Sequence, residues 1–187
     1  LKSNNLIVSY RSFNRLGPDY GAINPDHPVS MTEKQVNQLE EKQRIIDLTI
    51  AYTWIIDHGP RENLQEVFTE DAVFIIDTRH LNGIDEIRGK IERTLGGLSA
   101  SQHIVSNHQV SIDGNTATSR CYLHAQHTLN GTEGGDNYIM AGRYIDKLIR
   151  FDDEWRITER QLMLDWTEGN NQVLARKNRK SERDNVL

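Results

Sequence analysis

The stretch from residue 102 to residue 166 restricts the fold more than any other part of this chain. It holds four long segments with the character of β-strands, separated by short turn sequences. Asp113-Gly114 is a strong hairpin signal, and Asp152-Asp153 marks a second turn. Segments joined by such tight turns predict an antiparallel meander. The predicted strands are 102–112, 116–130, 138–151 and 155–166, with a polar loop at 131–137.

A long helix is predicted ahead of this meander. Thr32 and Gln35 fit a capping box at its start, and Gly59-Pro60 ends it. Residues spaced by three or four form a stripe that is expected to face the core. The stripe comprises Val36, Leu39, Gln43, Ile46, Ile50, Thr53 and Asp57. Asp57 lies in the last turn, where the helix dipole is unfavourable for an anion, so we expect a cation or an imidazole opposite it.

Three further elements are predicted between the long helix and the meander. They are a short helix at 61–68, a strand at 71–77 and a third helix at 83–98. The fold class is therefore α+β, with a curved antiparallel sheet packed on about three N-terminal helices. A sheet of this kind, closed at one end by the long helix, leaves a cavity at its mouth.

One folded domain is expected at residues 31–168. Gly and Pro residues interrupt residues 1–30, which predicts an extended arm. The apolar residues of this arm could dock on the domain or on a neighbouring subunit, or the arm could be a frayed terminus. Residues 169–187 are polar and charged, which predicts a solvated tail.

Composition and charge argue against several classes of function. The length of 187 residues suits one domain with a sizeable core. The net charge of −5 gives no sign of a nucleic-acid-binding face. No stretch approaches the ~20 apolar residues of a membrane-spanning helix, and no signal-peptide pattern opens the chain. The single cysteine, Cys121, excludes an internal disulfide and fits a reducing, cytoplasmic location.

Asp57 and His103 are the main candidates for chemistry, because neither fits an apolar core without a polar partner. A neutral imidazole accepts a proton near physiological pH. A carboxylate on its other ring nitrogen fixes the tautomer and stabilises the imidazolium that forms. We predict that the two residues meet in a pocket and act as a general base. The competing interpretations are a core histidine bonded to a backbone carbonyl and a helix-end acid in solvent.

The alternation along strand 116–130 predicts which of its side chains face the pocket. One of its two faces is smaller and more apolar, so we place that face inward. The inward set comprises Ala117, Ser119, Cys121, Leu123, Ala125 and His127. His124 then faces outward. His108 follows His103 by five residues, and this odd separation predicts that it lies on the opposite face of its strand.

Other side chains are candidates for contact with a substrate. They are Tyr52, Trp54, Cys121, His127, Tyr144 and Arg160. Arg160 could stabilise negative charge on the substrate or leaving group, or form a salt bridge with a carboxylate such as Asp146. Tyr52 is equally consistent with core packing, the pattern at Trp54 favours packing over recognition, and His58 is expected at the surface. No pair of histidines has the spacing of a metal site, so neither a metal nor a cofactor is expected.

Several short motifs occur in an order that resembles a known family. They are Tyr52…Asp57, Phe68-Thr-Glu-Asp-Ala72, Gly83-Ile-Asp-Glu-Ile87, His103…Asn107, Gly142-Arg-Tyr144…Asp146…Arg150, Trp155-Arg-Ile157 and Arg160…Trp166. Over roughly residues 40–168 the chain resembles the SnoaL-like branch of the NTF2-like superfamily, which is related to scytalone dehydratase and hexachlorocyclohexane dehydrochlorinase. The resemblance implies a cone-shaped α+β barrel and a homo-oligomer, either a dimer or a trimer. In the two related lyases an Asp at the end of the first helix supports a His on the strand after the third helix, at positions that match Asp57 and His103.

The resemblance implies a cofactor-independent lyase or isomerase that acts on a small apolar or aromatic substrate. The reaction would be a dehydration, another elimination or a retro-aldol cleavage. A polyketide cyclase is the alternative enzyme. A non-catalytic subunit that resembles the β subunit of ring-hydroxylating dioxygenases is the alternative without an active site. The second pocket histidine of scytalone dehydratase lacks a clear counterpart, since Cys121 or His127 lies nearest, so dehydration of scytalone itself is not expected.

Overall fold

The computed structural model describes residues 31–175. The predicted N-terminal arm and most of the predicted polar tail lie outside the described residues. The chain divides into two compact units, Leu1–Glu41 and Lys42–Leu187, and the sheet belongs to the second. In the first unit, the Thr32 backbone N–H donates to Gln35 Oε1 at 2.9 Å, and the Gln35 N–H donates to Thr32 Oγ1 at 3.3 Å. The predicted capping box is therefore confirmed.

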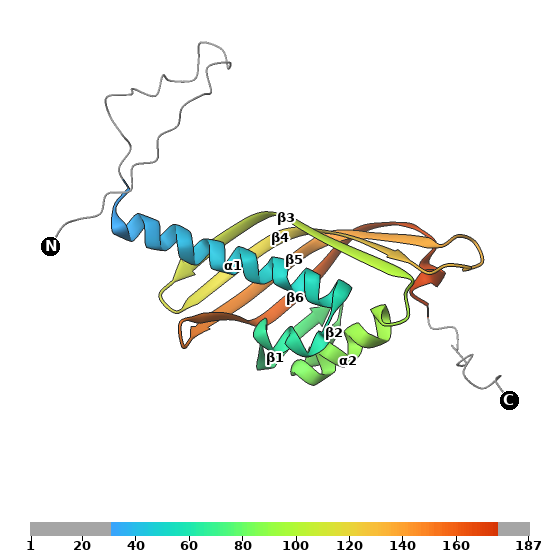
Figure 1. The fold of residues 1–187 in the computed structure, drawn as a ribbon, viewed down its shortest axis with the longest axis horizontal. Helices are drawn as coiled ribbons and strands as arrows, with labels where there is room; N and C mark the ends of the chain where they lie inside the picture. The colour runs from blue at the N-terminus through green and yellow to red at the C-terminus, as the bar shows by residue number, and fades with distance from the viewer. Residues whose placement is uncertain (1–30, 176–187) are drawn as a thin grey trace, which may run out of the picture. The chain divides into compact units, whose positions relative to one another are not determined.

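Two α-helices, two short 3-10 helices and six strands follow one another along the described residues (Figure 1). In chain order they are α1 (Glu33–His58), η1 (Arg61–Glu66), β1 (Phe68–Ile76), β2 (Arg79–Asn82), α2 (Ile84–Leu95), β3 (Ala100–Asp113), β4 (Thr116–Thr128), β5 (Asn137–Phe151), β6 (Glu154–Gly169) and η2 (Asn171–Val173). The four predicted strands of the meander and the Asp113-Gly114 hairpin are confirmed. β2 was not predicted, and β1 begins at Phe68, which the prediction had placed in a helix.

The six strands form one curved, open sheet in the order β2-β1-β6-β5-β4-β3. β3 to β6 pair in antiparallel fashion, as predicted. The sheet as a whole is mixed, because β1 pairs in parallel with β6, with Phe74 opposite Arg160. The predicted curved sheet with its antiparallel meander is confirmed, and the parallel β1–β6 pair is an addition to it that was not predicted. After η1 the chain forms β1, which pairs with β6, a strand that comes much later in the sequence. No turn sequence near β1 therefore indicates this pairing.

The hydrophobic core lies between the helices and one face of the sheet, which we call the inner face. It joins apolar side chains of α1, α2 and the strands in a single cluster. On α1 the buried positions are Ile45, Thr49, Tyr52, Thr53 and Ile56. This stripe is rotated from the predicted one, since Ile50 is exposed and Tyr52 is buried. Ile45, Tyr52 and Ile56, which the predicted stripe left out, are therefore among its buried positions.

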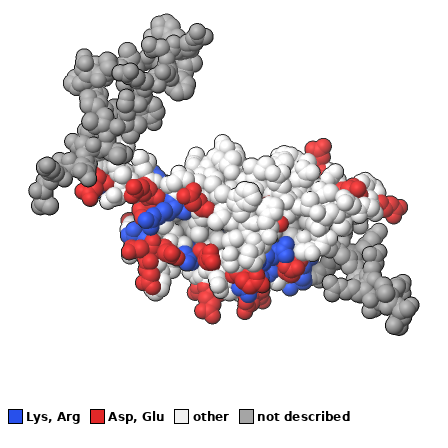
Figure 2. Space-filling view, viewed as in Figure 1, with Lys and Arg blue, Asp and Glu red and all other residues white. Residues whose placement is uncertain are grey.

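On the face shown in Figure 2, basic and acidic side chains are interspersed. Within residues 31–175, none of the helices has both the length and the hydrophobicity that a bilayer crossing requires.

Candidate active site

The last turn of α1 brings Asp57 against the first residues of β3. Asp57 Oδ1 lies 2.7 Å from Nδ1 of His103, and Asp57 Oδ2 accepts the backbone N–H of His103 at 2.7 Å. The two side chains are only 6% and 7% exposed, respectively. The structure therefore brings together the carboxylate and the imidazole that the sequence singled out, with the imidazole opposite the acid at the helix end.

The hydrogen bonds of Asp57 assign the tautomer of His103. An ionised carboxylate only accepts hydrogen bonds, so Nδ1 of His103 carries a proton and donates it to Asp57 Oδ1. Nε2 of the neutral ring then keeps its lone pair. Burial alone would raise the pKa of Asp57, but the hydrogen bond and charge of His103, with further bonds from Ser101 and the His103 backbone, lower it below its usual value. Asp57 is therefore ionised at neutral pH.

Ser101 is a residue of this site that was not predicted. Its hydroxyl donates to Asp57 Oδ1 at 2.7 Å, so the same oxygen accepts bonds from Ser101 and His103. The signal was present in the sequence, because residues two apart on a strand share a face. The polar side chain two positions before His103 could therefore be expected to face the same way as His103, although not to bond Asp57 in particular.

His127 of β4 lies beside the Asp57–His103 pair. The rings of His127 and His103 are 5.3 Å apart, and His127 is 3% exposed. Burial and the neighbouring His103 lower the pKa of His127 to about 4, so its ring is neutral at physiological pH. Nδ1 of His127 is buried without a hydrogen-bond partner. The predicted inward face of β4 is confirmed, because all six of its residues are buried.

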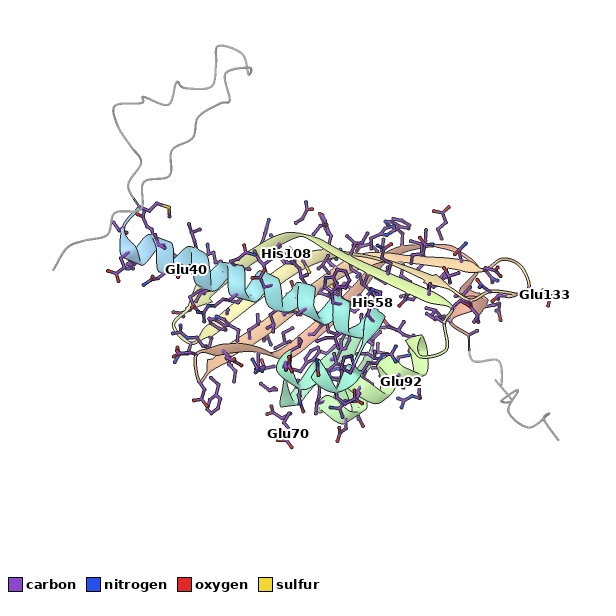
Figure 3. All side chains as sticks on the ribbon, in the orientation of Figure 1. Glu40, His58, Glu70, Glu92, His108 and Glu133 are labelled. Carbon is purple, nitrogen blue, oxygen red and sulfur yellow. The ribbon has the colours of Figure 1, made fainter. Side chains whose placement is uncertain are left out.

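His108 faces inward, so its predicted outward orientation was wrong. The register between β3 and β4 shifts after Ser106, and Asn107 has a φ of 56°. This bulge adds a residue and reverses the alternation of side chains. His108 Nε2 lies 2.7 Å from Thr49 Oγ1, whose own proton is donated to the carbonyl of Ile46. His108 therefore donates to Thr49 and ties β3 to α1 (Figure 3).

Arg160 forms the salt bridge that the sequence left open as one of two roles. Its Nε and Nη2 donate to the two carboxylate oxygens of Asp146 at 2.8 and 2.7 Å, and neither side chain is exposed. The guanidinium carbon lies 4.3 Å from the ring centres of both Tyr52 and Tyr144. Nη1 is buried without a partner. Because Asp146 balances its charge, Arg160 is better suited to contact a neutral oxygen than an anion.

Tyr52, Tyr144 and Cys121 are buried beside this ion pair. Burial raises the pKa of both tyrosine hydroxyls, so they carry their protons. Burial also raises the pKa of the Cys121 thiol to about 11, which removes thiolate chemistry at neutral pH. These three groups line the inner face as neutral side chains.

Trp54 lies apart from the other candidate residues of the site. It is 64% exposed, and its ring lies 5.3 Å from that of His58, which is also exposed, as predicted. Trp54 follows the buried Tyr52 by two residues, which corresponds to about 200° around the helix. Trp54 therefore lies on the side of α1 that faces away from the inner face, and Figure 3 shows His58 at the C-terminal end of α1.

Two surface cavities lie away from this site. One, of about 480 Å³, is bordered by residues 44–51 of α1 and by residues 153–156 at the β5–β6 turn. The other, of about 540 Å³, lies between β2 and α2. Among the residues from 31 to 175, no three His, Cys, Asp or Glu side chains gather as a metal site. The inner face thus holds two groups of titratable side chains, one around Asp57 and His103 and the other around Arg160 and Asp146.

Comparisons with known proteins agree with this architecture. The chain matches the model of the SnoaL-like domain over residues 37–161. An uncharacterized protein of Mycobacterium tuberculosis is 32% identical over 130 residues, which cover 67% of this chain and 86% of the relative. Among solved structures, a candidate scytalone dehydratase from Novosphingobium aromaticivorans has a TM-score of 0.66 at 21% identity, covering 72% of this chain and 91% of that one. A type 2 hexachlorocyclohexane dehydrochlorinase has a TM-score of 0.65 at 15% identity, covering 72% and 92%.

Proposed function

Because this chain belongs to the SnoaL-like family of NTF2-like proteins, we propose that it is a cofactor-independent lyase or isomerase with an Asp–His general base. The observation that carries the proposal is the 2.7 Å bond between Asp57 Oδ1 and His103 Nδ1. This bond leaves Nε2 of His103 as the free basic nitrogen in a site that is nearly closed to water. An imidazole held in this way is suited to remove a proton from a bound molecule.

The reaction would begin when Nε2 of His103 takes a proton from a carbon of the substrate. In an elimination, the electron pair of that C–H bond forms the new double bond while the leaving group departs with its own bonding pair. In a retro-aldol cleavage, the proton comes from a hydroxyl group instead. Asp57 stabilises the imidazolium that forms, and such positioned proton transfer is worth about 10²–10⁴-fold in rate.

The substrate we infer is small and mostly apolar or aromatic. The apolar side chains around the inner face, among them the buried Leu123 and the partly buried Val105 and Met140, favour such a molecule. The lone pair on Nδ1 of a neutral His127 could accept a hydrogen bond from a hydroxyl of the substrate. Arg160 Nη1, which is buried without a partner, would then meet a neutral oxygen farther along the same face.

The proposal is tested by turnover. The purified protein would be offered a panel of small aromatic β-hydroxy ketones, which report dehydration, and chlorinated cyclohexanes, which report dehydrochlorination. These classes are chosen from the names of the two structural neighbours. Asp57→Asn and His103→Ala should each lower kcat/KM by at least about 10²-fold. His124→Ala is the matched control, because His124 is an exposed histidine on the opposite face of the sheet. Near-normal turnover in both site variants would overturn the assignment.

A homo-oligomer is the second part of the proposal. Several large apolar side chains are exposed on the outer face of the sheet, among them Ile104 at 51%, Tyr122 at 57% and Trp166 at 50%. Aromatic and aliphatic groups gathered on one sheet face favour burial against another protein surface. Light scattering on the purified chain should give a dimer or a trimer, and Tyr122→Glu should shift it toward monomer. A wild-type chain that stays monomeric at high concentration would contradict this part.

The alternative from another class is a non-catalytic subunit of a larger assembly. Such a subunit would share the fold and would require no base. This hypothesis predicts that a large subunit that contains iron copurifies with the chain. The contact between Asp57 and His103 favours the enzyme, because a purely structural subunit does not need a buried imidazole with a free nitrogen. Turnover by the isolated chain would decide for the enzyme. Copurification without turnover would decide for the subunit.

A further inference from the structure

The Asp57 carboxylate accepts three hydrogen bonds from two residues of β3. The Ser101 hydroxyl and Nδ1 of His103 both donate to Oδ1, and the His103 backbone N–H donates to Oδ2, each at 2.7 Å. Ser101 and His103 can act together because side chains two apart on a strand share a face. The short segment that supplies the imidazole therefore also supplies the groups that hold its carboxylate.

We propose that Ser101 is a positioning residue of the Asp57–His103 pair. Its hydroxyl keeps Asp57 ionised and oriented, so that His103 stays in the tautomer with a proton on Nδ1 and a lone pair on Nε2. This inference rests on the proposed function for its catalytic meaning. The hydrogen bonding that it describes can be measured without any substrate.

Asp57 needs this support because two features of its position oppose its charge. It is largely buried, and it lies in the last turn of α1, where the helix dipole disfavours an anion. Each hydrogen bond donated to the carboxylate offsets part of that cost. Within residues 31–175, the side chains that donate to Asp57 are those of Ser101 and His103, and of these only the Ser101 hydroxyl is not a base. Its contribution therefore persists when His103 gains or loses a proton.

Ser101 also affects whether the Nδ1 proton stays on His103 after Nε2 has taken a proton. If Asp57 were a stronger base, the Nδ1 proton of a charged His103 would move onto the carboxylate. The ring would then become neutral while Nε2 still holds the proton that it took from the substrate. A hydroxyl that donates to Oδ1, the same oxygen that faces Nδ1, lowers the basicity of that oxygen. The ring then stays an imidazolium, which gives its Nε2 proton to the leaving group or product more readily than a neutral ring does.

The inference is tested by nuclear magnetic resonance on the full chain. Nitrogen-15 shifts of the His103 ring report its tautomer, and carbon-13 shifts of the Asp57 carboxylate report its titration. In Ser101→Ala the pKa of Asp57 should rise, and a population of His103 with its proton on Nε2 should appear. Ser101→Thr keeps a hydroxyl and should retain the wild-type tautomer. Ser101→Cys offers a weaker donor and should fall between them.

Ser106→Ala is the matched control, because Ser106 is an exposed serine on the same strand. It should leave both signals unchanged. An unchanged tautomer and an unchanged Asp57 titration in Ser101→Ala would overturn the inference. If Ser101→Ala does not fold, the comparison of Thr and Cys at this position decides alone, since equal signals in the two variants would also overturn it.

Turnover separates this inference from the proposed function. If the wild type is active, Ser101→Ala should lower kcat/KM by about 10- to 100-fold, as expected when a hydrogen bond to a charged group is lost. An active wild type with an unaffected Ser101→Ala variant would refute the role of Ser101 and leave the proposed function intact. An inactive wild type with the expected tautomer change would refute the function and leave the positioning role intact.

Discussion

Arg160 donates to both carboxylate oxygens of Asp146 across neighbouring strands, and neither side chain is exposed to solvent. The rings of Tyr52 and Tyr144 lie 4.3 Å from the guanidinium carbon. A charge buried in this way is tolerated only while its partner is present. The ion pair is therefore a structural requirement of the inner face, whatever Arg160 contributes to a substrate.

Removal of one partner of this ion pair should destabilise the fold strongly. We expect Asp146→Asn to lower the free energy of unfolding by about 3–5 kcal/mol, because the Arg160 charge remains buried without compensation. Urea unfolding measures this change. Lys147→Ala, which breaks the exposed Lys147–Glu159 pair on the same two strands, is the control and should cost less than about 1 kcal/mol. Equal losses in the two variants would contradict the prediction.

The lowered pKa of Asp57 predicts how stability depends on pH. A carboxyl group whose pKa is lower in the folded state stabilises the fold above its unfolded pKa, and this contribution is lost as the pH falls through the folded pKa. The wild type should therefore lose stability below about pH 4. This part of the loss should be absent in Asp57→Asn. Urea unfolding at a series of pH values measures both curves, and parallel curves would refute the assignment.

The lowered pKa of His127 acts in a different pH window. In the unfolded chain its ring binds a proton below about pH 6.5, whereas in the folded protein it does so only below about pH 4. The unfolded state thus binds more protons between these values, so stability should fall as the pH drops from about 6.5 to 4. His127→Gln should flatten the profile there by up to about 3 kcal/mol. His124→Gln, at an exposed histidine of the same strand, should not flatten it.

The β3 bulge should tolerate glycine and reject a branched side chain at Asn107. This residue has a φ of 56°, a conformation that glycine adopts freely and valine does not. Asn107→Gly should leave the midpoint of thermal unfolding close to that of the wild type. Asn107→Val should cost about 1–2 kcal/mol of stability. If valine were tolerated as well as glycine, the left-handed conformation at this position would be wrong.

Features with a local cause were predictable from the chain alone. The Asp113-Gly114 turn requires only neighbouring residues, and the buried face of β4 follows from a period of two that no irregularity interrupts. The capping box of α1 is local as well. Asp57 and His103 are separated by 46 residues, so no spacing rule relates them. Their pairing was expected because the motifs resemble a family.

Features that depend on the relation between distant segments were missed or mistaken. The bulge at Asn107 turns His108 inward, and an alternation count cannot detect an extra residue whose effect appears only against β4. Trp54 was placed with the substrate, yet the rotation of α1 about its axis exposes it. Ser101 was overlooked because its importance lies in its partner, Asp57, on another element.

The order of elements, the hairpins and the class of the fold are properties of short stretches of sequence, where backbone preference and side-chain periodicity act within a few residues. The parallel pairing of β1 with β6, the inward turn of His108 and the three bonds on Asp57 arise only when the helices pack on the sheet. The physical reason is that hydrogen bonds and desolvation depend on distances in space. A linear chain does not specify which distant polar groups will share a buried environment until the core has closed around them.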